Sequence, residues 1–115
     1  MALTKDQILG AADLTKEEVE VPEWNGSVFV RMLTAKERDV LESFWLARKE
    51  SGNFTNARAQ IVSLTVCDED GNRLFTEEDV EALSGKSAAA LQKVYNVAMR
   101  LNRFTKKDVE ELTKN

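Results

Sequence analysis

From residue 56 onward the chain carries apolar side chains on most sides of a predicted helix. The apolar members are Ala57, Ile61, Val62, Leu64 and Val66. A helix that is apolar around most of its circumference has to be enclosed by other elements, and a chain of 115 residues has enough material for one hydrophobic core but not for two. We therefore expect a single domain over residues 1–115, with this helix at its centre.

Five further helices are predicted from capping residues and apolar stripes. Thr34 and Glu37 stand at the spacing of a capping box and precede a helix over residues 35–50 whose apolar residues share one face. Thr4 and Gln7 have the same spacing and start a short helix within residues 1–14. Thr76 can cap a short acidic helix that ends at Leu83, and Ser87 can cap a long helix from Ala88 to about Asn102. A last helix, charged and weakly anchored, begins at Thr105.

A β-hairpin is predicted near the N-terminus, because apolar and polar side chains alternate on both sides of Asn25-Gly26. This dipeptide favours a tight two-residue turn, since both residues tolerate positive φ. We expect a two-stranded antiparallel hairpin over residues 17–32, with Pro22 ending its first strand because proline has no N–H to donate. The predicted fold is mainly α with this small β part: about five to six helices in a compact bundle, with the helical body over residues 34–115.

The charge balance restricts the possible partners. Twenty acidic against sixteen basic residues give a net charge of −4, and the basic residues alternate with acidic ones instead of forming a basic face, so no nucleic acid partner is expected. No apolar run approaches the roughly 20 residues needed to span a bilayer, so no membrane role is expected. The single cysteine and the lack of a charged-then-apolar leader favour a cytoplasmic protein.

Asp68, Asp70 and Asn72 form the strongest candidate for a metal site. A calcium-binding loop takes oxygen ligands at its first, third and fifth positions, and these three residues match that spacing. The same loop requires Gly at its sixth position and Glu at its twelfth, where this chain has Arg73 and Asp79. The alternative is a plain acidic turn that caps the next helix, and we expect no metal or cofactor.

No pattern in the sequence predicts an enzyme. Because the chain has no histidine, it lacks the commonest general base, and a zinc site would be limited to one thiol and carboxylates. Cys67 follows the apolar helix and is predicted to pack as a small buried side chain. The alternative, a reactive thiol at the helix end, has no histidine to take its proton.

Large apolar side chains are the remaining candidates for a functional surface. Phe44 and Trp45 lie on the helix over residues 35–50, and Trp24 lies beside the predicted turn; each of them can pack in the core or contact a partner. A two-stranded hairpin also has two unpaired edges, to which a strand of a second copy could add. The candidates for contact with a partner or a second copy are Trp24, Val28, Val30, Phe44, Trp45, Val97 and Met99.

Seven blocks of sequence follow one another between residues 19 and 102. The first are residues 21–26 (VPEWNG), 28–31 (VFVR) and 33–39 (LTAKERD). The later ones are Ala57-Arg58, residues 67–75 (CDEDGNRLF), residues 79–87 (DVEALSGKS) and Leu101-Asn102. In this order the blocks resemble the sequences of small tail assembly chaperones of lambda-like phages with long, non-contractile tails.

The resemblance implies a helper protein, absent from the virion, that binds the tape measure protein, keeps its extended helices soluble and helps the tail tube protein to assemble around it in the host cell cytoplasm. It also implies a longer, frameshifted form of the chain as a partner. It assigns no catalytic residue. Because weak apolar contacts add up when several copies are joined, we also expect homo-oligomers, with the hairpin and one helix face at the interface.

Two other functions fit the same size and charge. A small structural adaptor or head-tail completion protein would remain in the finished particle, so mass spectrometry of purified particles separates it from a chaperone. A helical DNA-binding regulator could contain a helix-turn-helix among its short helices, although the acidic balance argues against it. A gel-shift experiment at low salt tests that function.

Overall fold

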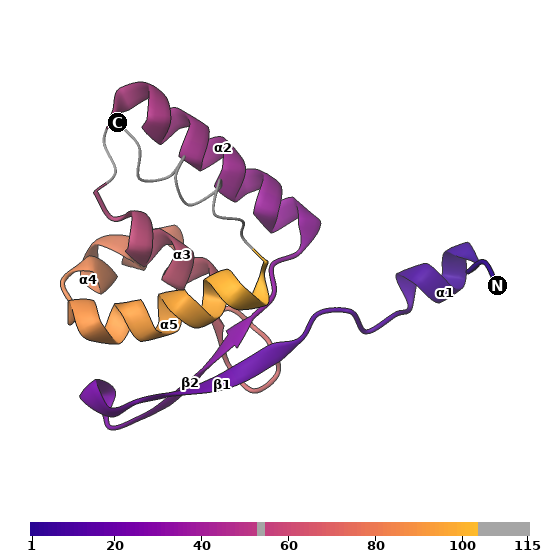
Figure 1. The fold of residues 1–115 in the computed structure, drawn as a ribbon, viewed down its shortest axis with the longest axis horizontal. Helices are drawn as coiled ribbons and strands as arrows, with labels where there is room; N and C mark the ends of the chain where they lie inside the picture. Colours follow the sequence, from indigo (N-terminus) through magenta and orange to yellow (C-terminus); the bar gives the residue numbers. More distant parts are fainter. Residues whose placement is uncertain (53–54, 104–115) are drawn as a thin grey trace.

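Residues 1–52 and 55–103 are described by the computed structural model, and they form a mainly α-helical fold with a small antiparallel sheet (Figure 1). The element order is α1 (Lys5–Leu9), β1 (Lys16–Val21), η1 (Pro22–Trp24), β2 (Gly26–Arg31), α2 (Ala35–Ser51), α3 (Ala57–Thr65), β3 (Val66–Cys67), η2 (Glu77–Asp79), α4 (Val80–Ser84) and α5 (Ala88–Leu101). The predicted fold class is confirmed. The helix predicted from Thr105 onward lies outside the described residues. Within the described ranges, no helix combines the length and apolar character needed to cross a membrane.

The sheet has three strands in the described residues, in the order β1-β2-β3, where the sequence predicted two. β1 pairs with β2 from Lys16↔Arg31 to Val21↔Gly26, and β2 pairs with β3 through Val30↔Val66 and one further residue pair. Val66 was expected to continue the central helix, but its backbone is extended. Because Val66 and Cys67 are buried, their backbone groups need partners, and the ladder with β2 supplies them.

The connection between β1 and β2 is longer than the predicted two-residue turn. Gly26 already pairs with Val21 in the ladder, and residues 22–25 form the connection, mostly as the 3-10 helix η1. Asn25 alone takes a left-handed backbone conformation there, with φ +57°, and its N–H donates to the carbonyl of Pro22 at 3.0 Å. The prediction that Pro22 ends the first strand is confirmed, because it begins η1 directly after β1.

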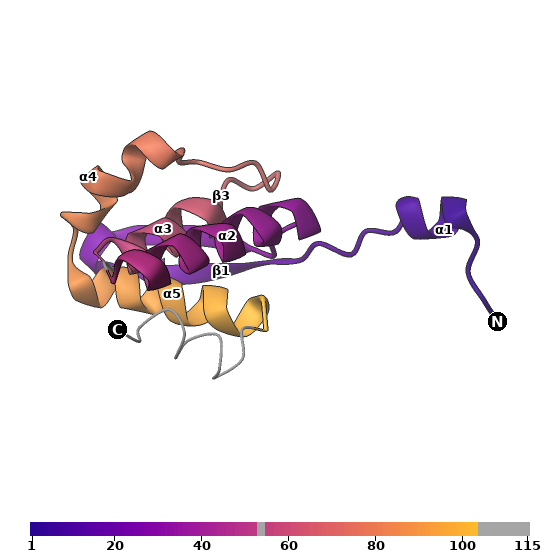
Figure 2. The ribbon, with the colours of Figure 1, turned by 90° about the horizontal axis from the view of Figure 1, so that it is seen from above.

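The core is built around α3, as predicted. Seven consecutive residues of α3, from Ala59 to Thr65, are buried. In Figures 1 and 2, α5 lies along α3 and across the sheet, while α4 covers another side of α3. The buried hydroxyls of Ser63 and Thr65 donate to the carbonyls of Gln60 and Ile61, at 2.8 Å each, so they add no unpaired polar group to the core.

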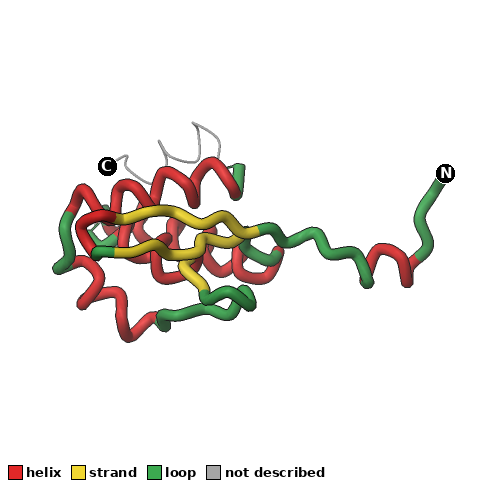
Figure 3. The backbone as a smooth tube through the Cα atoms, turned by 90° about the horizontal axis from the view of Figure 1, so that it is seen from below, coloured by secondary structure: helices red, strands yellow, loops and turns green. Residues whose placement is uncertain are grey.

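The first fourteen residues project away from this core (Figures 1 and 3). We call residues 1–14 the N-terminal arm; every side chain in it is exposed. The predicted short helix is present as α1, with the predicted capping box: Thr4 Oγ1 accepts from the N–H of Gln7, and Gln7 Oε1 accepts from the N–H of Thr4. The arm therefore has local structure but buries none of its side chains on the body.

Candidate functional site

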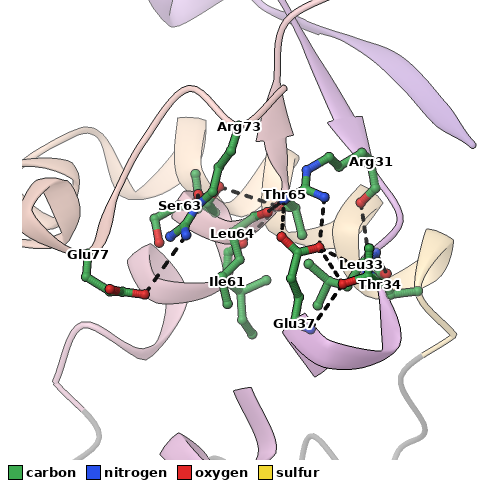
Figure 4. Close-up of polar contacts among 12 residues, drawn as sticks. Arg31, Leu33, Thr34, Glu37, Ile61, Ser63, Leu64, Thr65, Arg73 and Glu77 are labelled. Atoms are coloured by element: carbon green, nitrogen blue, oxygen red, sulfur yellow. Dashed lines mark hydrogen bonds and ion pairs between the residues drawn. The ribbon is translucent and has the colours of Figure 1, made fainter. Parts of the chain in front are cut away.

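A polar network centred on Arg31 joins β2, α2 and α3 (Figure 4). These elements position the side chains that could form a binding surface. The Arg31 guanidinium donates to both carboxylate oxygens of Glu37, at 2.9 and 2.6 Å, and to the carbonyl of Leu64 at 3.0 Å. That carbonyl belongs to the last turn of α3, where no further helical N–H is available to it. One side chain of β2 thus joins the start of α2 to the end of the core helix.

Arg73, which follows α3 in the sequence whereas Arg31 precedes it, contacts the same end of this helix (Figure 4). Its Nε donates to the carbonyl of Ser63 at 2.9 Å, and its guanidinium lies 4.0 Å from the Glu77 carboxylate. A cation is favourable at this position because the helix dipole makes the C-terminal end of a helix negative. The two arginines therefore provide α3 with side-chain partners for its last carbonyls.

Asn102 fixes the end of α5 to the link between β2 and α2. Its Oδ1 accepts from the N–H of Leu33 at 2.7 Å, and its Nδ2 donates to the carbonyls of Ala98 at 2.9 Å and Arg31 at 3.4 Å. The next residue along the link, Thr34, caps α2 through the predicted box with Glu37. The sequence motifs predicted this cap but not that Glu37 also binds Arg31, because that pairing depends on how β2 meets α2.

The charged form of Glu37 is stabilised within this network. Hydrogen bonds from Arg31 lower the pKa of Glu37 from its ordinary value of 4.5 to about 2, and the backbone N–H of Thr34 adds to the effect. Burial of the carboxyl group acts in the opposite direction, but it is outweighed. Only about a quarter of the side chain is exposed, at 26 %.

We expect the network to lose stability in acid. Because the pKa of Glu37 is about 2 in the folded state and near 4.5 when the chain unfolds, its contribution is complete above pH 4.5 and disappears as the pH falls toward 2. The contribution should be about 2 kcal/mol in the free energy of unfolding, since a pKa unit corresponds to about 1.4 kcal/mol and the group is partly solvated. Urea denaturation of the wild type and Glu37→Gln at pH 6 and at pH 2.5 measures it. The stability gap should close at the lower pH; a gap of constant size would contradict the prediction.

The acidic turn has a structural role. Asp68 Oδ1 accepts from the N–H of Asp70 at 2.9 Å and from that of Asn72 at 3.0 Å, and Gly71 takes φ +85° inside the turn. Further on, Asp79 Oδ2 accepts from the N–H of Thr76 at 2.8 Å at the start of η2. These contacts fit the turn-and-cap interpretation. In the part of the chain that the structure describes, no three Asp, Glu, Cys or His side chains lie together in a way that could hold a metal ion.

Cys67 is buried, with 1 % of its surface exposed, as the sequence predicted. Burial raises the pKa of its thiol, which keeps the thiol protonated, and the nearby cations Arg31 and Lys16 only partly offset this effect. A buried, protonated thiol is a poor nucleophile. Cys67 therefore acts as a small packing residue of β3.

The predicted contact residues are divided between the core and its margin. Val30 is fully buried and Trp45 is 7 % exposed, so both belong to the core. The other five are half-buried and pack against the core from outside: Trp24, Val28, Phe44, Val97 and Met99. They come from η1, β2, α2 and α5, so the structure does not gather them on one element.

Trp24 contributes to a pocket of about 360 Å³ between η1 and α4. The pocket is lined by Trp24, Phe75, Asp79, Ala82, Leu83 and Lys86. The connection that carries Trp24 is held against α5 by the ion pair of Glu23 with Lys93, whose nitrogen lies 2.7 Å from the carboxylate. The pocket is mostly apolar, and its two charged residues have opposite signs.

Exposed apolar side chains also lie outside the set of predicted contact residues. On α2 these are Val40 and Leu46, which are 51 % and 59 % exposed. On the N-terminal arm they are Leu3, Ile8, Leu9 and Leu14, and Leu74 follows the acidic turn. A stripe pattern identifies the apolar residues of a helix, but it does not show which of them remain uncovered after folding.

Comparison with known proteins supplies the family. The fold is similar to that of the tail assembly chaperone of bacteriophage HK97, with a TM-score of 0.61, 20 % sequence identity, and coverage of 84 % of this chain and 94 % of that one. A search of the curated proteins finds no match. The model of the phage tail assembly chaperone family matches residues 8–115. This chain therefore belongs to the phage tail assembly chaperone family.

Proposed function

We propose that this protein binds the tape measure protein in the host cell cytoplasm, keeps it soluble while tail tube protein assembles around it, and is left out of the finished particle. The observation that carries the proposal is the family match over residues 8–115, because the family is defined by assistance in tail assembly. No enzymatic step is part of the proposed function.

The exposed apolar side chains of α2 support the proposal. Val40 is exposed on a 17-residue helix, and the half-buried Phe44, four residues later, extends the apolar area beside it. Leu46 is exposed on another side of the same helix, six residues after Val40. Long amphipathic helices aggregate through their apolar stripes, and an apolar surface on a soluble helper can cover such a stripe. The first turn of the helix is held in place by Thr34 and by the Arg31–Glu37 pair.

Self-association is part of the proposed function, because many copies are needed to cover a long client. We propose that homo-oligomers use the half-buried residues around the hairpin and helices: Trp24, Val28, Phe44, Val97 and Met99. Val30 and Trp45 would support this surface from the core side. A longer, frameshifted form of the chain and the tail tube protein are the further proposed partners.

Co-expression with the tape measure protein tests client binding. The double variant Val40→Asp with Leu46→Asp should lower the amount of soluble, co-purifying client at least tenfold, since each lost apolar contact weakens binding by on the order of 1 kcal/mol. The variant Ala35→Asp is the matched control, because it adds a carboxylate at an exposed position of the same helix where the dipole favours it.

Two results would contradict the proposed function. The first is a tape measure protein that stays equally soluble with the double variant, or without this protein. The second is detection of this protein in purified particles by mass spectrometry at a fixed copy number, which would favour a structural adaptor.

A further inference from the structure

The N-terminal arm contains a helix that the rest of the chain does not stabilise. α1 has five residues and buries none of them. Isolated helices shorter than about 12 residues are marginally stable in water, because the free energy cost of nucleation exceeds the stabilisation from their few hydrogen bonds. The sequence nevertheless gives α1 a complete capping box at Thr4 and a terminating Gly10. A helix of this kind becomes stable when its apolar side is covered.

One side of α1 is suited to such a contact. Ile8 and Leu9 are 57 % and 74 % exposed. Lys5 lies three residues before Ile8 and four before Leu9, so all three side chains share one face of the helix. Asp6 lies three residues before Leu9, so it borders this face as well. The arm thus presents two aliphatic side chains with one cation and one anion beside them.

The pocket next to Trp24 has complementary properties. Its volume of about 360 Å³ lies at the lower end of the range for ligand sites, which suits a few aliphatic side chains better than a large ligand. Its lining combines the apolar Trp24, Phe75, Ala82 and Leu83 with one charge of each sign, Asp79 and Lys86. A cation such as Lys5 can therefore pair with Asp79, and an anion with Lys86.

The arm and the pocket lie at opposite ends of the molecule. The arm leaves the body at the start of β1, whereas the pocket lies beyond the end of β1, between η1 and α4 (Figures 1 and 3). The arm points away from the pocket of its own chain. We propose that Ile8 and Leu9 of one copy occupy the Trp24 pocket of a second copy, with Lys5 against Asp79. This contact rests on the self-association that belongs to the proposed function.

Two copies can associate more favourably through the arm and the pocket than through strand pairing at the edge of the sheet. The outer edge of β1 carries Glu17, Glu18 and Glu20 among its six residues. Two such edges placed side by side would bring like charges together, which disfavours strand pairing between copies. The arm-to-pocket contact instead joins opposite charges and covers apolar side chains. Because the contact uses two different surfaces, one copy can insert its arm into the pocket of a second copy while its own pocket holds the arm of a third.

Sedimentation velocity on the full-length chain tests the contact. The arm variant Ile8→Asp with Leu9→Asp, and the pocket variant Ala82→Arg, should each weaken self-association at least tenfold, because one puts charges into the pocket and the other fills it with a cation that repels Lys5. Ala82 is exposed, and the arm side chains touch no core residue, so both variants should keep the wild-type thermal melting curve. Ala35→Asp, which adds a carboxylate at an exposed position of α2, is the control, and it should self-associate as the wild type does.

Mixing the two variants gives the decisive result. The arm variant retains an intact pocket and the pocket variant retains an intact arm, so an equimolar mixture should form a heterodimer at a concentration at which each variant alone sediments as a monomer. Wild-type self-association in either variant, or a mixture that stays monomeric, would overturn the inference. A pocket variant that still self-associates but no longer binds the tape measure protein would assign the pocket to the client and overturn it as well. Client co-purification by the arm variant is measured separately, so loss of the arm contact and failure of the proposed function give different results.

Discussion

Replacing Arg31 with alanine is expected to lower the free energy of unfolding by about 3 kcal/mol, which corresponds to a fall of roughly 10 °C in Tm. The Arg31 side chain is only 11 % exposed, and its loss leaves Glu37 without its cation and the Leu64 carbonyl without its donor. Removing one partner of a largely buried ion pair costs more than the pair itself contributes, because the remaining charge stays poorly solvated. Urea denaturation monitored by circular dichroism measures the change.

The matched control is Arg100→Ala. Arg100 also pairs with a glutamate, Glu17, but the two side chains are 61 % and 42 % exposed. A surface pair of this kind contributes about 0–1 kcal/mol, so the control should remain within about 1 kcal/mol of the wild type. The double variant Arg31→Ala with Glu37→Ala should recover part of the loss, since it removes the uncompensated charge. Equal effects of the two arginine substitutions would contradict the central position of Arg31 in the network.

Replacing Ile61 with alanine is expected to have the other large effect, a loss of about 4 kcal/mol in the free energy of unfolding. Ile61 is fully buried in α3, which contacts α4, α5 and η2. Its truncation removes apolar contacts and leaves a cavity that the surrounding helices can fill only in part. Because this loss is a large fraction of the stability of a small domain, Ile61→Val, expected to cost about 1 kcal/mol, gives a second measurement on a folded protein.

Ile8→Ala is the control for the core substitution, because it makes the same chemical change on the exposed arm. It should alter the free energy of unfolding by less than about 0.5 kcal/mol, since the side chain has no tertiary contacts to lose. Comparable destabilisation by Ile8→Ala and Ile61→Ala would mean that the arm packs on the body in solution. A small stability effect together with weaker self-association is the result expected from the arm-to-pocket contact.

The polar network explains what several of the family-like sequence blocks do in this chain. Arg31, Glu37, Arg73 and Asn102 all belong to those blocks, and all of them hold backbone or charged groups at the junction of β2, α2, α3 and α5. They are positioning residues of the fold. The surfaces that we propose for contact with partners lie elsewhere, on the exposed side of α2, on the arm and around Trp24.

Features that depend on neighbours along the chain were predicted correctly. The boxes Thr4–Gln7 and Thr34–Glu37 are present, Ser87 accepts from the N–H of Ala90, and the central helix is buried along most of its length. Each of these follows from contacts across three or four residues or from the apolar character of one segment. The prediction of a two-residue turn was wrong, because residues 22–24 form the 3-10 helix η1, whose Glu23 pairs with Lys93, 70 residues away in the sequence.

The sequence by itself determined the type and approximate limits of the described α-helices and of β1 and β2, and the family-like blocks indicated the class of protein. Only the tertiary structure decided that β3 adds a third strand, that Asn102 reaches the carbonyl of Arg31 across 71 residues, that Val30 and Trp45 are core residues, and that Ile8 and Leu9 remain uncovered. The physical reason is the distance along the chain over which each interaction acts. Capping and helical periodicity involve residues within one or two turns of a helix, whereas strand pairing, burial and exposure depend on which distant segments come to lie beside a residue.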